Sequence, residues 1–324
     1  MEVMSYKDFA AAGNRGTNIY LDLEENSYGI TVESGALTKA GGLFDLDRRV
    51  LVVTDDGVPE EYAEAVASQC REPYIVTLPH GEATKNFESF RQLLSEMLSH
   101  SFTRKDCVVA VGGGVIGDLS GFAAACYMRG VDFYNVPTTL LSQVDSSIGG
   151  KTAIDLDGVK NIAGAFYQPK GVLIDPETLK TRDSRQLHAG LAEAIKMAAT
   201  SDAFLFKKIE ESSDLQADLQ TIIVGALLIK RDVVQQDPKE NGLRKILNFG
   251  HTIGHAIESF GEGRLLHGEC VAAGMIPMCS DRAAERLKSV LAKYDLPVSL
   301  PDAGRLAGGA DDIIKAGADE LMPF

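Results

Sequence analysis

Three of the chain's six histidines, His251, His255 and His267, lie close together in the sequence. His251 and His255 are four residues apart, so on a helix they would share one face. Neutral imidazoles combined with one carboxylate form a common catalytic zinc set that leaves a position open for substrate. Glu193 is the strongest candidate carboxylate, because an acid on an otherwise apolar helix face is costly to bury without a cation. Glu193 and these histidines are therefore the candidate ligands of a divalent metal.

Each of these residues also has a simpler interpretation. Two histidines in an HxxxH pair are often satisfied by hydrogen bonds alone, and the zincin motif is absent because Thr252 replaces its glutamate. Lys196 stands three residues after Glu193 and offers that carboxylate an ordinary ion pair. Asn248 is the expected N-cap of the helix that carries His251. The acid and the histidines taken as one group favour the metal site over these alternatives.

A second group of residues has the pattern of a phosphate-binding loop. The β-rich run 106–111 leads into GGGVIGD (112–118) and a helix, which places backbone N–H groups and the positive helix end beside an anion. The glycines match GxGxxG, although so late in the chain that a standard Rossmann topology is not expected. A tight turn without ligand is the alternative. The polar segments 136–141 and 144–152 follow neighbouring strands and favour a dinucleotide pocket.

The elements that would position these groups change in character near residue 175. Before it, β-rich runs alternate with helical stretches, as in a mostly parallel sheet covered by helices. We expect the first two strands to form an antiparallel hairpin at the sheet edge. The expected strands are 18–23, 28–33, 49–54, 73–78, 106–111, 132–136 and 171–175. After residue 175, helical periodicity dominates. The prediction is a Rossmann-like α/β dinucleotide-binding domain at 1–175 and an all-α metal- and substrate-binding domain at 176–324.

The composition excludes several classes of protein. The net charge of −14 argues against nucleic acid as a partner but permits a small anionic substrate bound by a few local cations. The five cysteines form no CxxC pair, as in a cytoplasmic protein with reduced thiols. The sequence contains neither a signal-peptide pattern nor an apolar run long enough to cross a membrane. We therefore expect a soluble, cytoplasmic enzyme.

Taken in order and spacing, short motifs between Leu51 and His267 resemble the 3-dehydroquinate synthase family, part of the sugar-phosphate cyclase superfamily. They are GEATK, GGGVIGDLSGFAAA, PTTLL, VDSSIGGKT, GAFYQP, GLAEAIK, LNFGHTIGHA and HGE. The resemblance implies a homodimeric shikimate-pathway lyase of aromatic amino acid biosynthesis, with NAD and zinc or cobalt as cofactors. It implies conversion of 3-deoxy-D-arabino-heptulosonate 7-phosphate to 3-dehydroquinate and phosphate.

The same resemblance implies roles for individual residues. Glu193, His251 and His267 match the zinc ligands, and Arg129 matches an arginine that reaches the substrate phosphate in the partner subunit. The positions that match NAD-binding residues are Asp55, Glu82, Lys85, Gly113, Gly114, Val115, Asp118, Thr138, Thr139, Lys151 and Lys160. The positions that match catalytic and substrate-binding residues are Asp145, Lys151, Lys160, Asn161, Lys196, Lys230, Arg244, Asn248 and His255. Among these, His255 is the expected proton-transfer group.

The chain also departs from the family pattern. Asp155 stands where the family commonly has Asn, and Val159 stands where it commonly has Gly. Relatives usually continue into an Asp-Lys-Lys segment that helps bind phosphate, and this chain ends at Phe324, about where that segment would begin. The same motifs allow three other functions. These are a different sugar-phosphate cyclase such as 2-deoxy-scyllo-inosose synthase, a metal-dependent polyol dehydrogenase, and a non-catalytic nucleotide-binding relative. Arg244 and Lys230, placed where the family grips the substrate carboxylate, favour the dehydroquinate reaction.

Overall fold

The computed structural model describes residues 16–261 and 263–306. These residues divide into two compact units, of which the first ends at Arg182 and the second begins at Asp183. The short 3-10 helix η6 (Pro176–Thr181), which follows the predicted boundary at residue 175, belongs to the first unit. The end of the chain, where the family's phosphate-binding segment was expected to begin, lies outside the described residues.

The first unit is built on a seven-stranded sheet with the order β1-β2-β9-β6-β5-β3-β4. Neighbouring strands are parallel except β1 and β2, which form the expected antiparallel hairpin at one edge. The strands are β1 (Thr17–Leu21), β2 (Tyr28–Val32), β3 (Arg49–Asp55), β4 (Glu72–Leu78), β5 (Cys107–Gly112), β6 (Asp132–Pro137) and β9 (Gly171–Ile174). All seven strands predicted from the sequence are present. The fully buried β5 is an apolar run, as expected of a strand covered on both faces.

The strand order creates a switch point between β3 and β5. From β3 the chain runs to β4 on one side, and it then crosses to β5, β6 and β9 on the other side. Open α/β sheets bind ligands outside the carboxyl ends of their strands at such a point. Asp55 ends β3 and Gly112 ends β5. The glycine loop therefore lies where this class of sheet binds its ligands.

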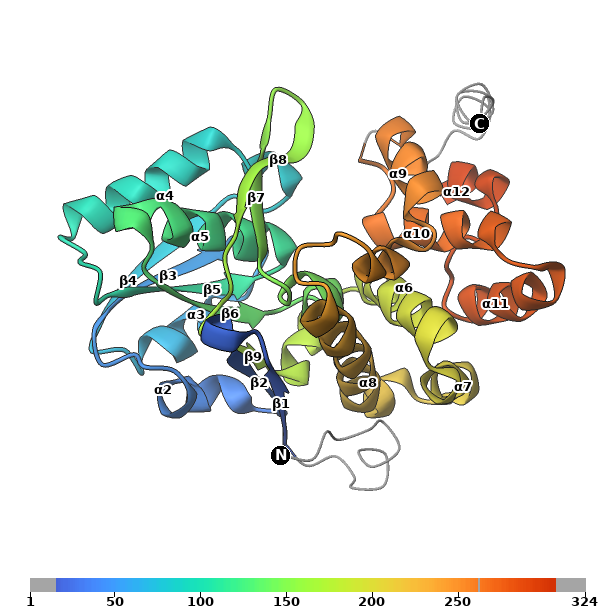
Figure 1. Ribbon diagram of the computed structural model, residues 1–324, viewed down its shortest axis with the longest axis horizontal. Helices are drawn as coiled ribbons and strands as arrows, with labels where there is room; N and C mark the ends of the chain where they lie inside the picture. The colour runs from blue at the N-terminus through green and yellow to red at the C-terminus, as the bar shows by residue number, and fades with distance from the viewer. Residues whose placement is uncertain (1–15, 262, 307–324) are drawn as a thin grey trace. The chain divides into compact units, whose positions relative to one another are not determined.

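Helices cover both faces of this sheet (Figure 1). On one face α4 and α5 pack through apolar side chains such as Leu93 and Leu119, and on the other α3 packs through Ala63 and Val66. The helices are α2 (Ala40–Leu43), α3 (Glu60–Ala67), α4 (Phe87–Ser99) and α5 (Gly114–Cys126). The short turns are η1 (Glu24–Asn26), η2 (Ala36–Lys39), η3 (Glu82–Thr84), η4 (Tyr127–Arg129) and the π-helical η5 (Ser142–Ser146).

A two-stranded hairpin of β7 (Lys151–Leu156) and β8 (Val159–Phe166) lies beside α5 and extends beyond the sheet (Figure 1). The sequence prediction missed it and treated the beginning of this region as a loop. The turn residues Asp157 and Gly158 have φ of 51° and 80°, the conformation of a two-residue type I′ turn. An Asp-Gly pair between two apolar runs is a hairpin signal, so the information was present in the sequence.

The second unit is helical, as predicted. Its helices are α6 (Ser184–Ser201), α7 (Ala203–Glu211), α8 (Leu215–Gln236), α9 (His251–Phe260), α10 (His267–Met275), α11 (Asp281–Lys293) and α12 (Leu300–Leu306), with short turns η7 (Leu243–Asn248) and η8 (Ile276–Met278). Asp183, Asp202 and Asp214 cap α6, α7 and α8 by accepting hydrogen bonds from backbone N–H groups. Within the described part of the chain, no helix has the length and apolar character needed to cross a bilayer.

Candidate metal and dinucleotide sites

In the second unit, α6, α9 and α10 bring one carboxylate and three imidazoles together. Glu193 Oε1 lies 3.7 Å from Nε2 of His251 and 3.6 Å from Nε2 of His267. One ring nitrogen from each of His251, His255 and His267 lies within 4.8 Å of the others. These separations fit atoms that each bind one cation at about 2 Å. The arrangement places the three predicted ligands around a common point, with His255 beside them.

The lysine pairing considered from the sequence is present together with this cluster. Lys196 Nζ donates a hydrogen bond to Oε2 of Glu193, and both side chains are buried. The other carboxylate oxygen, Oε1, faces His251 and His267. A carboxylate has two oxygens with several acceptor positions, so one group can serve a lysine and a cation at once. The two interpretations of Glu193 are therefore compatible.

A second carboxylate, which the sequence prediction missed, supports His267. The Nδ1 atom of His267 lies 2.9 Å from Oε2 of Glu258, which leaves Nε2 directed toward Glu193. A carboxylate on the far nitrogen is the usual partner of a metal-binding histidine, because it fixes the tautomer and the ring orientation. The available signal was helical spacing: Glu258 is seven residues after His251 on α9 and so shares its face.

The electrostatics of His267 indicate a site made for a cation. Burial by itself would lower the pKa of this imidazole, but hydrogen bonds and charges from Glu193 and Glu258 raise the pKa to about 10. The two carboxylates thus hold a proton on the ring in the absence of metal. A divalent ion bound at Nε2 would displace that proton and supply the positive charge in its place. The donor set therefore fits a divalent metal.

Close contacts between helices gather the ligands. A Cβ atom on Gly268 would lie 1.8 Å from the carbonyl oxygen of Ala189, so only glycine lets α10 approach α6 this closely. Gly250, with φ of 81°, begins α9 as its N-cap and lies against α10. The predicted N-cap, Asn248, was therefore wrong: it ends η7 two residues earlier, because the left-handed turn at Gly250 is what starts the helix.

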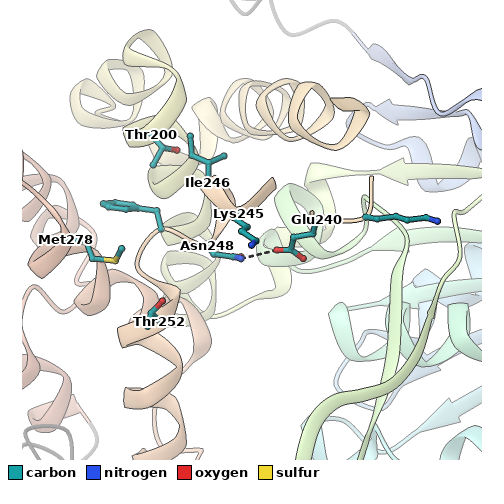
Figure 2. Close-up of a pocket in the computed structure, with 9 residues that line it drawn as sticks. Thr200, Glu240, Lys245, Ile246, Asn248, Thr252 and Met278 are labelled. Atoms are coloured by element: carbon teal, nitrogen blue, oxygen red, sulfur yellow. Dashed lines mark hydrogen bonds between the residues drawn. The ribbon is translucent and has the colours of Figure 1, made fainter. Parts of the chain in front are cut away.

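Asn248 instead lines a pocket of about 650 Å³ at the start of α9. Its Nδ2 atom donates to Oε1 of Glu240 at 2.9 Å, and Figure 2 shows the two side chains pointing toward each other, with Lys245 next to them. Thr252 lies on the α9 side of the pocket (Figure 2). A wall that combines an ammonium group, an amide and a hydroxyl can bind a polyhydroxylated anion.

Two further predicted cations of this unit, Lys230 and Arg244, are buried. The Arg244 guanidinium donates through Nη1 to the Pro238 carbonyl at 2.9 Å. Asp237 holds the loop that carries Arg244, because its carboxylate accepts hydrogen bonds from the backbone N–H groups of Asn241, Gly242 and Arg244 at 2.7–3.0 Å. These hydrogen bonds keep the pKa of Asp237 below its usual value. The sequence prediction did not single out Asp237.

In the first unit, the glycine loop leaves the sheet at the switch point. Gly113 is the N-cap of α5, and Gly114 and Val115 form its first turn, so their N–H groups lie at the positive end of the helix. Thr138 donates its backbone N–H to the Gly112 carbonyl at 2.9 Å, which ties the end of β6 to this loop. Thr139 packs beside Gly113. A Cβ atom added to Gly113 would lie 3.2 Å from the methyl group of Thr139.

The buried Lys85 joins two other predicted residues of this unit. Lys85 Nζ donates to Oδ2 of Asp118 at 2.5 Å and also to Oδ1 of Asn161. Asn161 has a φ of 56°, and its N–H donates to Oδ1 of Asp155 at 2.8 Å. Asp155, the residue that departs from the family pattern, therefore fixes the conformation of Asn161. Val159, the other departure, is exposed and has an ordinary backbone conformation, so glycine is not required there.

Most of the remaining predicted residues of the first unit lie on its surface or at element ends. Asp55 ends β3, and burial raises its pKa. Lys151 begins β7 and lines a small cavity together with Asp118. Asp145 lies in η5. The exposed side chains are Glu82, Arg129, Lys151 and Lys160.

The chain matches known proteins over most of its length. Residues 75–189 match the family model described as 3-dehydroquinate synthase N-terminal, and residues 190–307 match the model described as 3-dehydroquinate synthase C-terminal. A 3-dehydroquinate synthase of Clostridium acetobutylicum is 41% identical over 300 residues, which cover 86% of this chain and 84% of that protein. The expected family is thereby confirmed.

Solved structures with the same fold carry the cofactors predicted from the sequence. A 2-deoxy-scyllo-inosose synthase, solved with carbaglucose-6-phosphate, NAD⁺ and Co²⁺, has a TM-score of 0.80 at 25% identity and covers 90% of this chain and 86% of its own. A 2-epi-5-epi-valiolone synthase from Streptomyces hygroscopicus, solved with NAD⁺ and Zn²⁺, has a TM-score of 0.78 at 29% identity over 91% of this chain and 89% of its own. The fold, the two family models and the sequence identity agree: this chain belongs to the 3-dehydroquinate synthase family.

Proposed function

We propose that this chain converts 3-deoxy-D-arabino-heptulosonate 7-phosphate to 3-dehydroquinate and phosphate, using NAD and a divalent metal, zinc or cobalt. The observation that carries the proposal is the degree of similarity. The chain is 41% identical to a 3-dehydroquinate synthase but only 25% and 29% identical to cyclases that make other products. The acid and imidazole cluster at Glu193 supports the metal requirement.

The two cofactors have separate places in the chain. We assign the metal to Glu193, His251 and His267, and the dinucleotide to the switch point of the first unit, between Asp55 and the loop 112–118. When bound, NAD accepts and returns a hydride while the metal polarises the reacting hydroxyl. Asp118 and Lys85 would hold the hydroxyl groups and phosphates of the dinucleotide, together with Thr138, Thr139 and the first turn of α5.

Other residues of the second unit would bind substrate and move protons. His255 lies one helical turn from His251 and is exposed, so its imidazole can exchange protons with substrate and solvent. Lys196, which donates a hydrogen bond to Glu193, places a positive charge beside the proposed metal ligands. Lys230, Arg244 and Asn248 would bind the carboxylate and hydroxyl groups of the substrate. Within the first unit, we assign substrate binding to Asp145, Lys151, Lys160 and Asn161.

We further infer a cytoplasmic homodimer. All five cysteines are free, as in a reducing compartment. Arg129 is exposed and follows Met128 in a left-handed turn, with φ of 69° and 49°. An arginine held outward by such a turn can reach a neighbouring subunit, which supports the role inferred from the family. Sedimentation analysis that gave only a monomer would contradict this part of the proposal.

A comparison of three sugar phosphates, each supplied separately, tests the proposed substrate. Purified, metal-replete protein with NAD is given the heptulosonate phosphate, glucose 6-phosphate or sedoheptulose 7-phosphate, and released phosphate is measured. Because the buried Arg244 and Lys230 suit a carboxylate, we expect only the heptulosonate phosphate to react at an appreciable rate. A preference for either substrate without a carboxylate would contradict the proposal and favour another cyclase activity.

A further inference from the structure

We propose that Arg185 and Glu269 form a positioning pair that holds His267 in its metal-binding place. The inference rests on the proposed role of His267 as a metal ligand. Glu269 is part of the HGE motif, but neither the metal chemistry nor the substrate pocket uses it. Its side chain is only 3% exposed. A carboxylate that is buried this completely requires a specific set of partners.

The contacts of Glu269 converge on the residues that precede His267. Oε1 accepts a hydrogen bond from Arg185 Nε at 2.6 Å, and Oε2 accepts one from Arg185 Nη2 at 2.9 Å. Oε2 also accepts the backbone N–H of Leu266 at 2.8 Å. Arg185 Nη2 donates in addition to the Arg264 carbonyl at 2.8 Å. The pair therefore fixes the backbone at residues 264 and 266, immediately before the histidine.

The Arg185–Glu269 pair lies on the same helices as two of the predicted metal ligands. Arg185 lies in the first turn of α6, the helix that carries Glu193, and Glu269 lies in the first turn of α10, which His267 begins. Between them, Gly268 brings the α10 backbone against Ala189 of α6. The bidentate pair thus joins the same two helices whose separation sets the distance of 3.6 Å between Glu193 Oε1 and His267 Nε2. Bidentate arginine–carboxylate pairs fix orientation as well as distance.

Loss of the pair should weaken metal binding more than it weakens the fold. Without the Glu269 carboxylate, the Leu266 N–H loses its acceptor and the first turn of α10 can rotate, which moves the imidazole of His267. Removal of groups that orient metal ligands typically weakens metal affinity about 10–100-fold. Because Arg185 and Glu269 both lie in the second unit, dinucleotide binding by the first unit should change little.

Metal titration of single variants tests the proposal. Co²⁺ is titrated into metal-free wild type, Arg185→Met, Glu269→Gln and Arg185→Lys, and the dissociation constant and the melting temperature are measured for each. The matched control is Arg286→Met, since Arg286 makes a similar bidentate pair with Glu210, at 2.8 and 2.6 Å, between α11 and α7. We expect Arg185→Met and Glu269→Gln to raise the dissociation constant about 10-fold or more, Arg185→Lys to recover part of the affinity, and Arg286→Met to leave it unchanged.

The outcomes separate this inference from the proposed function. If Arg185→Met and Arg286→Met shifted the dissociation constant equally, the positioning role would be wrong, whatever the effect on melting temperature. If wild type bound no Co²⁺ at all, the proposed metal-dependent function would fail, and this inference with it. Tight wild-type binding with weakened Arg185 and Glu269 variants supports both.

Discussion

At the scale of single residues, the sequence around Glu193 suggested two kinds of partner, a lysine or a metal ion. It gave no way to choose between them. The spacing of three residues to Lys196 indicated an ordinary helical ion pair, and the apolar surroundings indicated a metal ligand. Both the lysine and candidate metal-binding histidines are present, since Oε2 of the carboxylate accepts a hydrogen bond from Lys196 and Oε1 faces His251 and His267. Spacing along one helix can predict the lysine contact, whereas the approach of His251 and His267 depends on how three helices pack. That is why spacing alone could not show which histidines face Glu193.

The loop that carries Arg244 provides a test of pH dependence at this scale. The folded-state pKa of Asp237 is lowered by three backbone hydrogen bonds. A lowered pKa means that its stabilisation is fully present above the ordinary value of 3.8 and disappears as the pH falls through the lower folded value. We expect Asp237→Asn to reduce the free energy of unfolding at neutral pH. The difference from wild type should vanish in acid, when the native carboxylate is also uncharged.

Denaturant titration of both proteins across this pH range measures the effect. A difference that stayed constant down to the most acidic pH would show that the charge on Asp237 does not stabilise the loop. Activity adds a second readout, because a displaced Arg244 should raise KM for substrate more than it lowers kcat.

At the scale of elements, much of the fold was predictable because its signals are local. Seven strands and the long helices follow from hydrophobic periodicity. The β7–β8 hairpin was missed because its glycine-rich approach at 144–150 resembles a ligand loop, although Asp157-Gly158 marked the turn. The start of α9 was misplaced because Gly250 is required by its contact with α10, a tertiary cause that no local pattern carries.

The packing of α10 against α6 gives a prediction for helix contacts. Gly268→Ala would place a Cβ atom 1.8 Å from the Ala189 carbonyl oxygen, so the two helices must separate. We expect a loss of about 1–3 kcal/mol in the free energy of unfolding, together with weaker metal binding, since His267 and Glu193 move apart. Thermal or denaturant unfolding and metal content after dialysis measure the two effects.

Gly42→Ala is the matched control. Gly42 lies in α2 of the first unit, and a Cβ atom there would meet nothing within 4 Å. Alanine in such a place is neutral or stabilises by about 0.4–1 kcal/mol. Equal effects of the two substitutions would mean that the glycine contact between α6 and α10 does not hold the metal ligands together.

At the scale of the whole molecule, the chain divides its chemistry between two units. The first carries the glycine loop and the Lys85–Asp118–Asn161 cluster, and the second carries the acid and imidazole cluster. This division explains why the glycine loop and the three histidines lie more than 100 residues apart in the sequence. We propose that both take part in one reaction, in which the dinucleotide is reduced and reoxidised within each turnover. A dehydrogenase would instead release the reduced cofactor.

The ratio of phosphate released to NAD supplied tests this account most directly. Metal-replete protein is incubated with the heptulosonate phosphate in large excess over NAD, while phosphate and the absorbance of NADH are followed together. We predict many phosphate ions per NAD, no net accumulation of NADH, and complete loss of phosphate release when EDTA removes the metal. Phosphate release that stops at one per NAD, or NADH that accumulates in proportion to product, would contradict the proposed reaction.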